Sequence, residues 1–187
     1  FAYAVGKLEL ERKQILDRLV SENPSIQLQS NGSYNTPNRQ ILLPTVFKSI
    51  ALITAPNSDG QRDFNKVIDH NKYGYAFAVT PFLTTIQGDT ASLLILQQLQ
   101  LIKASNLHFD VVVIVRGGGS DIDFKSFNDY ELAKAIALFP TPILTGIGHD
   151  RNTSIADLMA RQLKTPTEVA TFILENNMSF EREIEIL

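Results

Sequence analysis

The chain has 187 residues, 44% of them hydrophobic, which is enough to bury one sizeable core, and no apolar run approaches the roughly 20 residues of a membrane-spanning helix. Its formal net charge of -3 makes the whole chain a poor electrostatic match for DNA, so contact with nucleic acid must be local or be supplied by parts outside this segment. The absence of cysteine excludes disulfides and thiolate metal sites, and it suits the reducing cytoplasm, where we expect the protein to be located.

Predicted helices and strands alternate along most of the chain. The apolar runs at 49–54 and 111–115 are typical of strands buried on both faces, and Pro81 is expected to end the strand before it. In chain order, the pattern predicts a helix over about 7–22, a loop over 31–38, a strand at 49–54, a helix over 58–73, a strand at 75–80, a helix over 89–106, a strand at 111–115, a helix over 128–138, a strand at 142–146, a helix over 154–161 and a last helix from 167 onward. Helical crossovers between the strands predict an open, mostly parallel, Rossmann-like α/β sheet of at least four strands with helices on both faces.

The loops that follow the predicted strands carry the candidate site residues. Ligands of an open α/β sheet bind outside the carboxyl ends of its strands. These loops are rich in glycine, polar and charged residues, and they span 54–63, 81–89, 116–120 and 146–150. We therefore expect the four loops to open on one edge of the sheet.

Arg116 and the residues after it form the strongest local feature. Consecutive glycines let the backbone approach a ligand closely and adopt positive φ, so that their N–H groups can line an anion site. The arginine adds a planar cationic fork suited to phosphate, which favours phosphate binding over a flexible turn. The predicted phosphate-binding residues are Arg116, Gly117, Gly118, Gly119 and Ser120. The chain has neither a Walker loop nor a G-x-G-x-x-G fingerprint, which argues against an NTPase or a dinucleotide enzyme.

His149 and Asp63 are the candidates for proton transfer and its support. His149 follows a predicted strand, and an imidazole titrates near neutral pH, so it can act as general acid or base. Taken alone it is more typical of a structural histidine, but beside the loop of Arg116 a functional role is favoured. Asp63 lies about one turn into a predicted helix, where it can activate water, hold a metal, orient the other two groups, or simply interact with the helix dipole.

Several polar residues are expected to support this edge. Asn128 is the predicted N-cap of the helix over 128–138, and Asp123 precedes it. Asp157 is placed to bond back to the loop of His149. Thr165 or Thr167 is the expected cap of the last helix.

Five segments carry a resemblance to a known family. Residues 116–129, RGGGSDIDFKSFND, are similar to R-G-G-G-S-x-x-D-L-x-x-F-N-D, and residues 146–157, GIGHDRNTSIAD, to G-x-G-H-E-x-D-x-T-x-A-D. Residues 53–63 are similar to I-T-S-x-x-G-A-A-x-x-D, 87–88 to a Q-G pair, and 165–167 to T-P-[ST]. In order and spacing, from about Leu43 to Ala170, these motifs resemble the exodeoxyribonuclease VII large subunit family.

The resemblance implies an exonuclease that degrades single-stranded DNA from either end into short oligonucleotides, without a required cofactor; a divalent metal is not excluded. It implies a longer protein with an N-terminal OB-fold and a C-terminal helical region that binds a small subunit. The chain begins at Phe1 without methionine and ends in a helical pattern without a stop, so we expect an excised segment. Its expected parts are a helix and loop leading from the OB-fold (1–44), the α/β catalytic domain (45–170) and the start of the helical region (171–187).

Carried over by position, the implied catalytic set is Asp63, Arg116, His149 and Asn152, supported by Asp150, Asp157, Asp123 and Asn128. Three positions depart from the family motifs. Asn152 replaces an aspartate, and an amide cannot act as a base, although it can orient a phosphate or water. Asp150 is one methylene shorter than the family's glutamate, and Asp59 adds a negative charge near the expected phosphate. The alternative is a phosphate- or nucleic-acid-binding module without catalysis.

Overall fold

The computed structural model describes residues 2–118, 121–148 and 153–185. Within these residues, five parallel strands form one sheet in the order β4-β3-β5-β6-β7. The strands are β3 (Ser49–Thr54), β4 (Ala78–Leu83), β5 (Val111–Val115), β6 (Ile143–Gly146) and β7 (Arg161–Gln162). The open parallel α/β fold predicted from the sequence is confirmed, with one more strand than the four that were identified.

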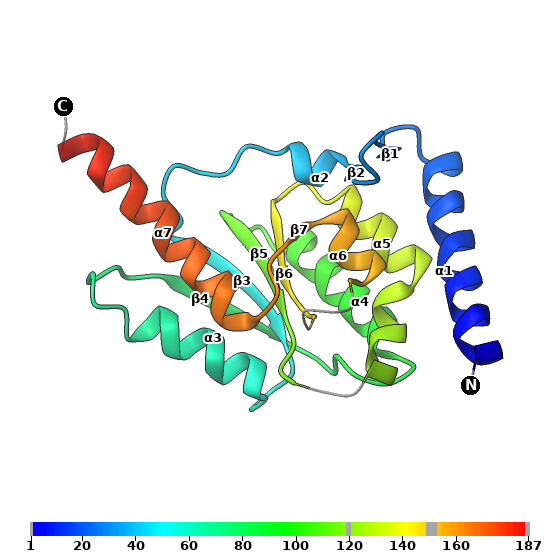
Figure 1. Ribbon diagram of the computed structural model, residues 1–187. Coiled ribbons are helices and arrows are strands. Elements are labelled where there is room, and N and C mark those ends of the chain that lie inside the picture. The colour runs from blue at the N-terminus through cyan, green and yellow to red at the C-terminus, as the bar shows by residue number, and fades with distance from the viewer. Residues whose placement is uncertain (1, 119–120, 149–152, 186–187) are drawn as a thin grey trace.

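Helices cover both faces of this sheet (Figure 1). One face carries α3 (Asp59–Asp69) and α7 (Pro166–Glu185), and the other carries α4 (Ala91–Ala104), α5 (Tyr130–Ala137) and α6 (Ile155–Met159). No helix in the described part of the chain combines the length and the apolar character needed to cross a membrane.

Further elements surround this core. The long helix α1 (Ala2–Glu22) packs outside α5, and the 3-10 segment η1 (Asp121–Asn128) precedes α5. The stretch expected to be a loop, 31–38, includes β2 (Tyr34–Asn35) and the start of α2 (Pro37–Gln40), and β2 pairs with β1 (Gln27–Leu28), just before this stretch, as a small antiparallel ribbon. These short elements lack a hydrophobic period long enough to be recognised in the sequence.

The alternation of side chains along the strands explains the two-layer core. In β3, Ile50 and Leu52 pack with α3 and α7, whereas Ala51 and Ile53 pack with α4 and α5. The same alternation holds in β5, where all five residues are buried. Successive strand residues point to opposite faces, so a strand covered on both sides must be apolar throughout.

Pro81 lies inside β4, so the prediction that it ends the strand is wrong. Among the strands that the structure describes, β4 pairs with β3 alone, so it lies at an edge of the sheet. The N–H groups of Ala78 and Thr84 donate to the carbonyls of Lys48 and Thr54, so even-numbered residues of β4 face β3. Pro81 has the opposite parity, and its nitrogen faces the open edge, where no ladder hydrogen bond is lost.

The start of α5 also differs from the prediction. Asp129, not Asn128, is the N-cap, and its side chain accepts from the N–H of Leu132 at 2.9 Å. The Asn128 side chain instead accepts from Arg12 Nη1 at 3.0 Å and from the N–H of Ile155 at 2.8 Å. Both residue types cap helices well, and these longer-range contacts decide which one does so here.

The strand order has a direct consequence for the site. β3 and β5 are neighbours, but α3 follows β3 on one face and α5 follows β5 on the other. The chain therefore leaves the carboxyl ends of these two strands toward opposite faces of the sheet. Open α/β sheets bind ligands at such a switch point.

Candidate functional site at the carboxyl edge of the sheet

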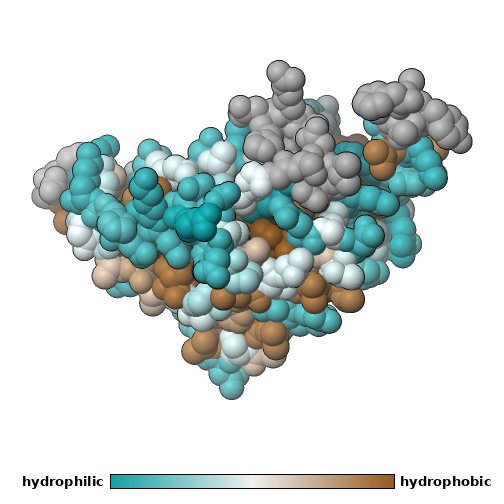
Figure 2. All heavy atoms as spheres, turned by 90° about the horizontal axis from the view of Figure 1, so that it is seen from below, coloured by the Kyte–Doolittle hydropathy of each residue, from teal (hydrophilic) through white to brown (hydrophobic). Residues whose placement is uncertain are grey.

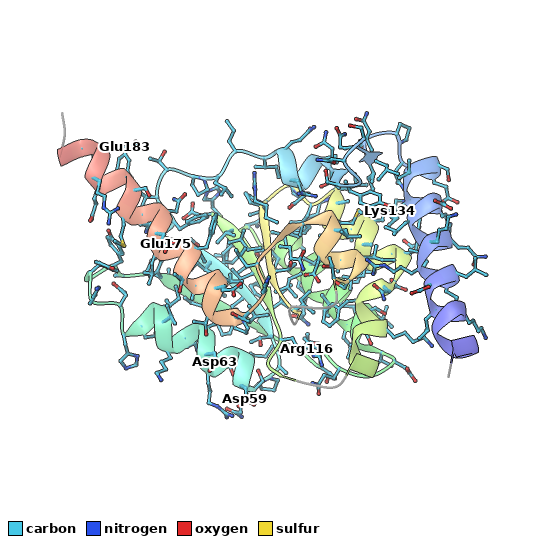
Figure 3. The ribbon with its side chains drawn as sticks, viewed as in Figure 1. Asp59, Asp63, Arg116, Lys134, Glu175 and Glu183 are labelled. Carbon is cyan, nitrogen blue, oxygen red and sulfur yellow. The ribbon has the colours of Figure 1, made fainter. Side chains whose placement is uncertain are left out.

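The candidate residues that the structure describes gather where β5 ends and α3 begins. Figure 3 shows Asp59, Asp63 and Arg116 along one edge of the molecule, at the carboxyl ends of the strands. Figure 2 looks onto this edge and shows hydrophilic residues over much of it, with hydrophobic residues exposed between them. These residues lie at the switch point between β3 and β5.

Arg116 is buried, with 3% of its surface exposed, directly after β5. Its backbone N–H donates to the carbonyl of Gly146 at 3.2 Å, which extends the pairing of β5 with β6 beyond the strand itself. Arginine is almost never buried unless it is paired, so this position is not that of a solvated surface residue. This hydrogen bond fixes the backbone of Arg116 where the glycine loop begins.

Gly60 and Gly117 let α3 meet the glycine loop backbone to backbone. A Cβ on Gly60 would lie 2.5 Å from the nitrogen of Gly117, and a Cβ on Gly117 would lie 2.7 Å from the nitrogen of Gly60. Neither Gly117 nor Gly118 has a φ in the left-handed region, so the expectation of positive φ at these two positions is wrong. Glycine is required at 117 for close approach, which places the positive end of the α3 dipole against the loop.

Gly146 makes a similar contact at the end of β6. A Cβ there would lie 2.8 Å from the carbonyl oxygen of Thr165 and 2.8 Å from a methyl of Val169. Thr165 is the N-cap of α7, because its hydroxyl accepts from the N–H of Glu168 at 3.1 Å. It is one of the two residues predicted to cap this helix. The ends of β5 and β6 and the beginnings of α3 and α7 thus meet at one edge.

Asp63 is exposed on α3, one turn beyond Asp59, as its position in the sequence predicted. It lines a hollow of about 550 Å³ between α3 and the first turn of α7, together with Lys66, Val67, His70 and Thr167. His70 is exposed here, and His108 is exposed at the opposite end of the sheet. Asp63 therefore faces open space that water or a ligand can enter.

Asp59, the first residue of α3, lies beside Gly117 of the glycine loop. A Cβ on Gly117 would lie 2.9 Å from the Cβ of Asp59. Asp59 accepts from Arg62 Nη2, and Arg62 Nη1 donates to the carbonyl of Asn57 at 2.8 Å. Arg62 was not predicted from the sequence, although its spacing of three residues from Asp59 on a helix is a signal for such a pair.

Asp157 and Asn128 fix the start of α6, the helix that follows β6. Asp157 is 1% exposed and accepts from Thr145 Oγ1 at 2.7 Å and from the N–H and hydroxyl of Ser154 at 3.0 and 2.8 Å. Burial raises the pKa of Asp157 above its ordinary value, and the hydrogen bonds from Thr145 and Ser154 offset part of this increase. Asn128 accepts from the N–H of Ile155, so both residues fix the start of α6 against the sheet and η1.

The comparisons with known proteins decide the family. Residues 34–187 match the family model described as exonuclease VII, large subunit. The chain belongs to this family.

Relatives named exodeoxyribonuclease 7 large subunit agree with this assignment. The Campylobacter fetus protein is 32% identical across 97% of this chain and 44% of its own length. The proteins of Legionella pneumophila (strain Paris) and Limosilactobacillus reuteri (strain DSM 20016) are 33% and 36% identical, across 92% and 81% of this chain and 42% and 33% of their own lengths. The chain spans less than half the length of these relatives.

Membership in the exonuclease VII large subunit family confirms the resemblance drawn from the motifs. The structure places Asp63, Arg116, Gly117 and Gly118 at the carboxyl edge, Asp123 in η1, and Asp157 and Asn128 behind it. Gly119, Ser120, His149, Asp150 and Asn152 lie outside the described residues. Among the residues that are described, no three or more histidine and carboxylate side chains are grouped to hold a metal ion.

Proposed function

We propose that this chain is the catalytic segment of an exonuclease that hydrolyses the phosphodiester bonds of single-stranded DNA to short oligonucleotides. One observation carries the proposal: a buried arginine and a glycine loop lie against the N-terminus of α3 at the switch point of the sheet. Backbone N–H groups, a helix dipole and a guanidinium are the groups that bind phosphate. Family membership supports DNA as the source of this phosphate.

The proposed reaction is an in-line attack of water on the phosphorus. Arg116 and the N–H groups of Gly117, Gly118 and Gly119 hold the phosphate, with the hydroxyl of Ser120, and stabilise the charge that develops in the transition state. His149 transfers a proton from the water or to the leaving oxygen. Asp63 orients His149 or the water, and Asn152 orients the phosphate or the water through its amide.

The proposal also includes the partners of the chain, its location and its need for a metal. The relatives' names describe a large subunit, and we propose that this chain acts with a small subunit and with DNA-binding parts outside the 187 residues, in the cytoplasm. The net charge of -3 supports this arrangement, because most of the electrostatic attraction for DNA must then come from the parts outside these 187 residues. We propose that no divalent metal is required, which predicts full activity in EDTA.

The test is hydrolysis of labelled single-stranded DNA by the complex with the small subunit, measured as acid-soluble product. His149→Ala should lower kcat by about 10²- to 10⁴-fold and Arg116→Lys by about 10²-fold, because proton transfer and the fixed guanidinium are lost. His108→Ala is the matched control, since the His108 side chain is 91% exposed at the other end of the sheet. Rates near wild type for both site variants would remove these residues from the mechanism.

A non-catalytic binding module is the second candidate, and Asn152 in place of a family carboxylate is the observation that favours it. Such a protein would bind single-stranded DNA with the small subunit present and never shorten it. Asn152→Asp separates the two functions. An increased rate is expected from an enzyme that lacks only one carboxylate, whereas a binding module would stay inactive.

A further inference from the structure

A carboxylate stands at the mouth of the proposed phosphate site, where a negative charge opposes binding. Asp59 packs against Gly117, and 69% of its side chain is exposed. An exposed carboxylate near a phosphate repels it only modestly, because water screens the interaction. Even so, the repulsion acts against the function of the loop unless something neutralises it.

Arg62 is the neutralising group, and it is held in place from two sides. One nitrogen of its guanidinium donates to Asp59 and another to the carbonyl of Asn57. Asn57 has a φ of 56°, and its own N–H donates to Gln61 Oε1 at 2.8 Å, so the turn before α3 is itself fixed to the helix. The guanidinium carries five N–H donors, and these two contacts leave donors for a ligand.

We propose that Arg62 is a DNA-binding residue that contacts the phosphate next to the one held by the glycine loop. Asp59 orients the Arg62 side chain and, by its negative charge, lowers the affinity for that phosphate. This inference rests on the proposed function. Arg62 has 65% of its side chain exposed on the first turns of α3, the element that meets the loop through Gly60. A DNA strand whose phosphate lies at the loop can extend over the neighbouring first turns of α3, where the guanidinium of Arg62 can exchange one carboxylate oxygen of Asp59 for a phosphate oxygen.

The two members of the pair make opposite predictions. Arg62→Ala removes a phosphate contact and exposes the charge of Asp59, so the Kd for a single-stranded oligonucleotide should rise by about three- to tenfold. Asp59→Asn removes the repulsion and releases the guanidinium, so the Kd should fall by about threefold. In the Arg62→Ala background, Asp59→Asn should still tighten binding, because the repulsion is removed there as well.

The measurement uses the complex with the small subunit, with a labelled oligonucleotide for Kd and its hydrolysis for KM. Lys103→Ala on α4 matches the charge lost in Arg62→Ala, and Asp69→Asn at the far end of α3 matches Asp59→Asn. Both control residues are exposed. The inference is overturned if the variants at 59 and 62 bind no differently from their controls.

The salt dependence separates a phosphate contact from a merely structural role in the turn. Each lost contact with single-stranded DNA should reduce the slope of log K against log salt by about 0.7. Arg62→Ala should show this reduction, and Arg62→Lys, which keeps the charge, should restore the slope. An unchanged slope in Arg62→Ala would contradict the inference.

Failure of this inference is distinct from failure of the proposed function. A wild-type complex that degrades DNA while Arg62→Ala matches its control leaves the enzyme in place and removes Arg62 from it. A wild-type complex that releases no nucleotides overturns the proposed function, and the comparison of Kd values then decides the role of Arg62 in binding alone.

Discussion

Two neighbouring glycines show how single residues control the site. Gly117 has no room for a side chain, because a Cβ would meet the backbone of Gly60, whereas a Cβ on Gly118 would meet nothing within 4 Å. Gly117→Ala should therefore push α3 away from the loop and lower the free energy of unfolding by about 1 to 3 kcal/mol. Gly118→Ala, one residue along, should change it by less than about 0.5 kcal/mol. Urea denaturation measures both, and equal effects would contradict the close approach.

The same pair of variants should separate in activity. The position of the loop relative to the N-terminus of α3 decides where the phosphate sits, and a misplacement of about 1 Å can lower a rate by about 10²-fold. Hydrolysis of single-stranded DNA by the complex is expected to fall strongly in Gly117→Ala and only slightly in Gly118→Ala. This comparison does not depend on which group transfers the proton.

The helix caps show how single side chains set the beginnings of α3 and α4. Ser58 caps α3, and its hydroxyl accepts from the N–H of Gln61 at 3.2 Å, whereas Thr90 precedes α4 without any side-chain capping bond. Ser58→Ala should cost about 1 kcal/mol of stability. Thr90→Ala is the matched control and should be close to neutral, as read from the midpoint of urea unfolding. A similar loss in both variants would mean that the hydroxyl of Ser58 contributes nothing as a cap.

The start of α6 should give the chain a pH-dependent stability. Burial raises the pKa of Asp157 in the folded chain, so the folded state binds this proton more tightly than the unfolded state does. The resulting stabilisation is full below the ordinary Asp pKa of about 3.9 and is lost as the pH rises through the raised value. Asp157→Asn has no such proton, so the advantage of wild type over the variant should shrink from about pH 4 to about pH 7. Urea unfolding at both pH values measures it, and an advantage that grows would contradict this sign.

The elements that could be predicted from the sequence are those whose own pattern of apolar and polar residues is enough to define them. β3 and β5 occupy the predicted ranges, because a strand covered on both faces must be apolar at every position. β7 could not be predicted, since its two residues, Arg161 and Gln162, become a strand only by pairing with β6. Arg62 was missed for the same reason: its importance depends on Asp59 lying against Gly117, a contact between segments far apart in the chain.

At the scale of the whole molecule, the sheet has an open edge that the sequence protects. In the described part of the chain, β4 is one of the two outer strands, and its even-numbered residues donate to β3, so the N–H groups of its odd-numbered residues face outward. Exposed strand edges of this kind pair with other chains and cause association. Pro81 removes one outward donor in the middle of the strand, which is a recognised way of protecting an edge.

Replacing this proline should therefore promote self-association without disturbing the fold. Pro81→Thr adds an N–H on the open side of β4, and threonine favours strands, so the variant should sediment as larger species at concentrations where the wild type does not. Pro140→Thr is the matched control, because Pro140 is exposed in the turn between α5 and β6. Association of both variants to the same extent would point to the added threonine and not to the edge. A Pro81→Thr variant that stays in the wild-type state would show that neighbouring side chains already protect β4.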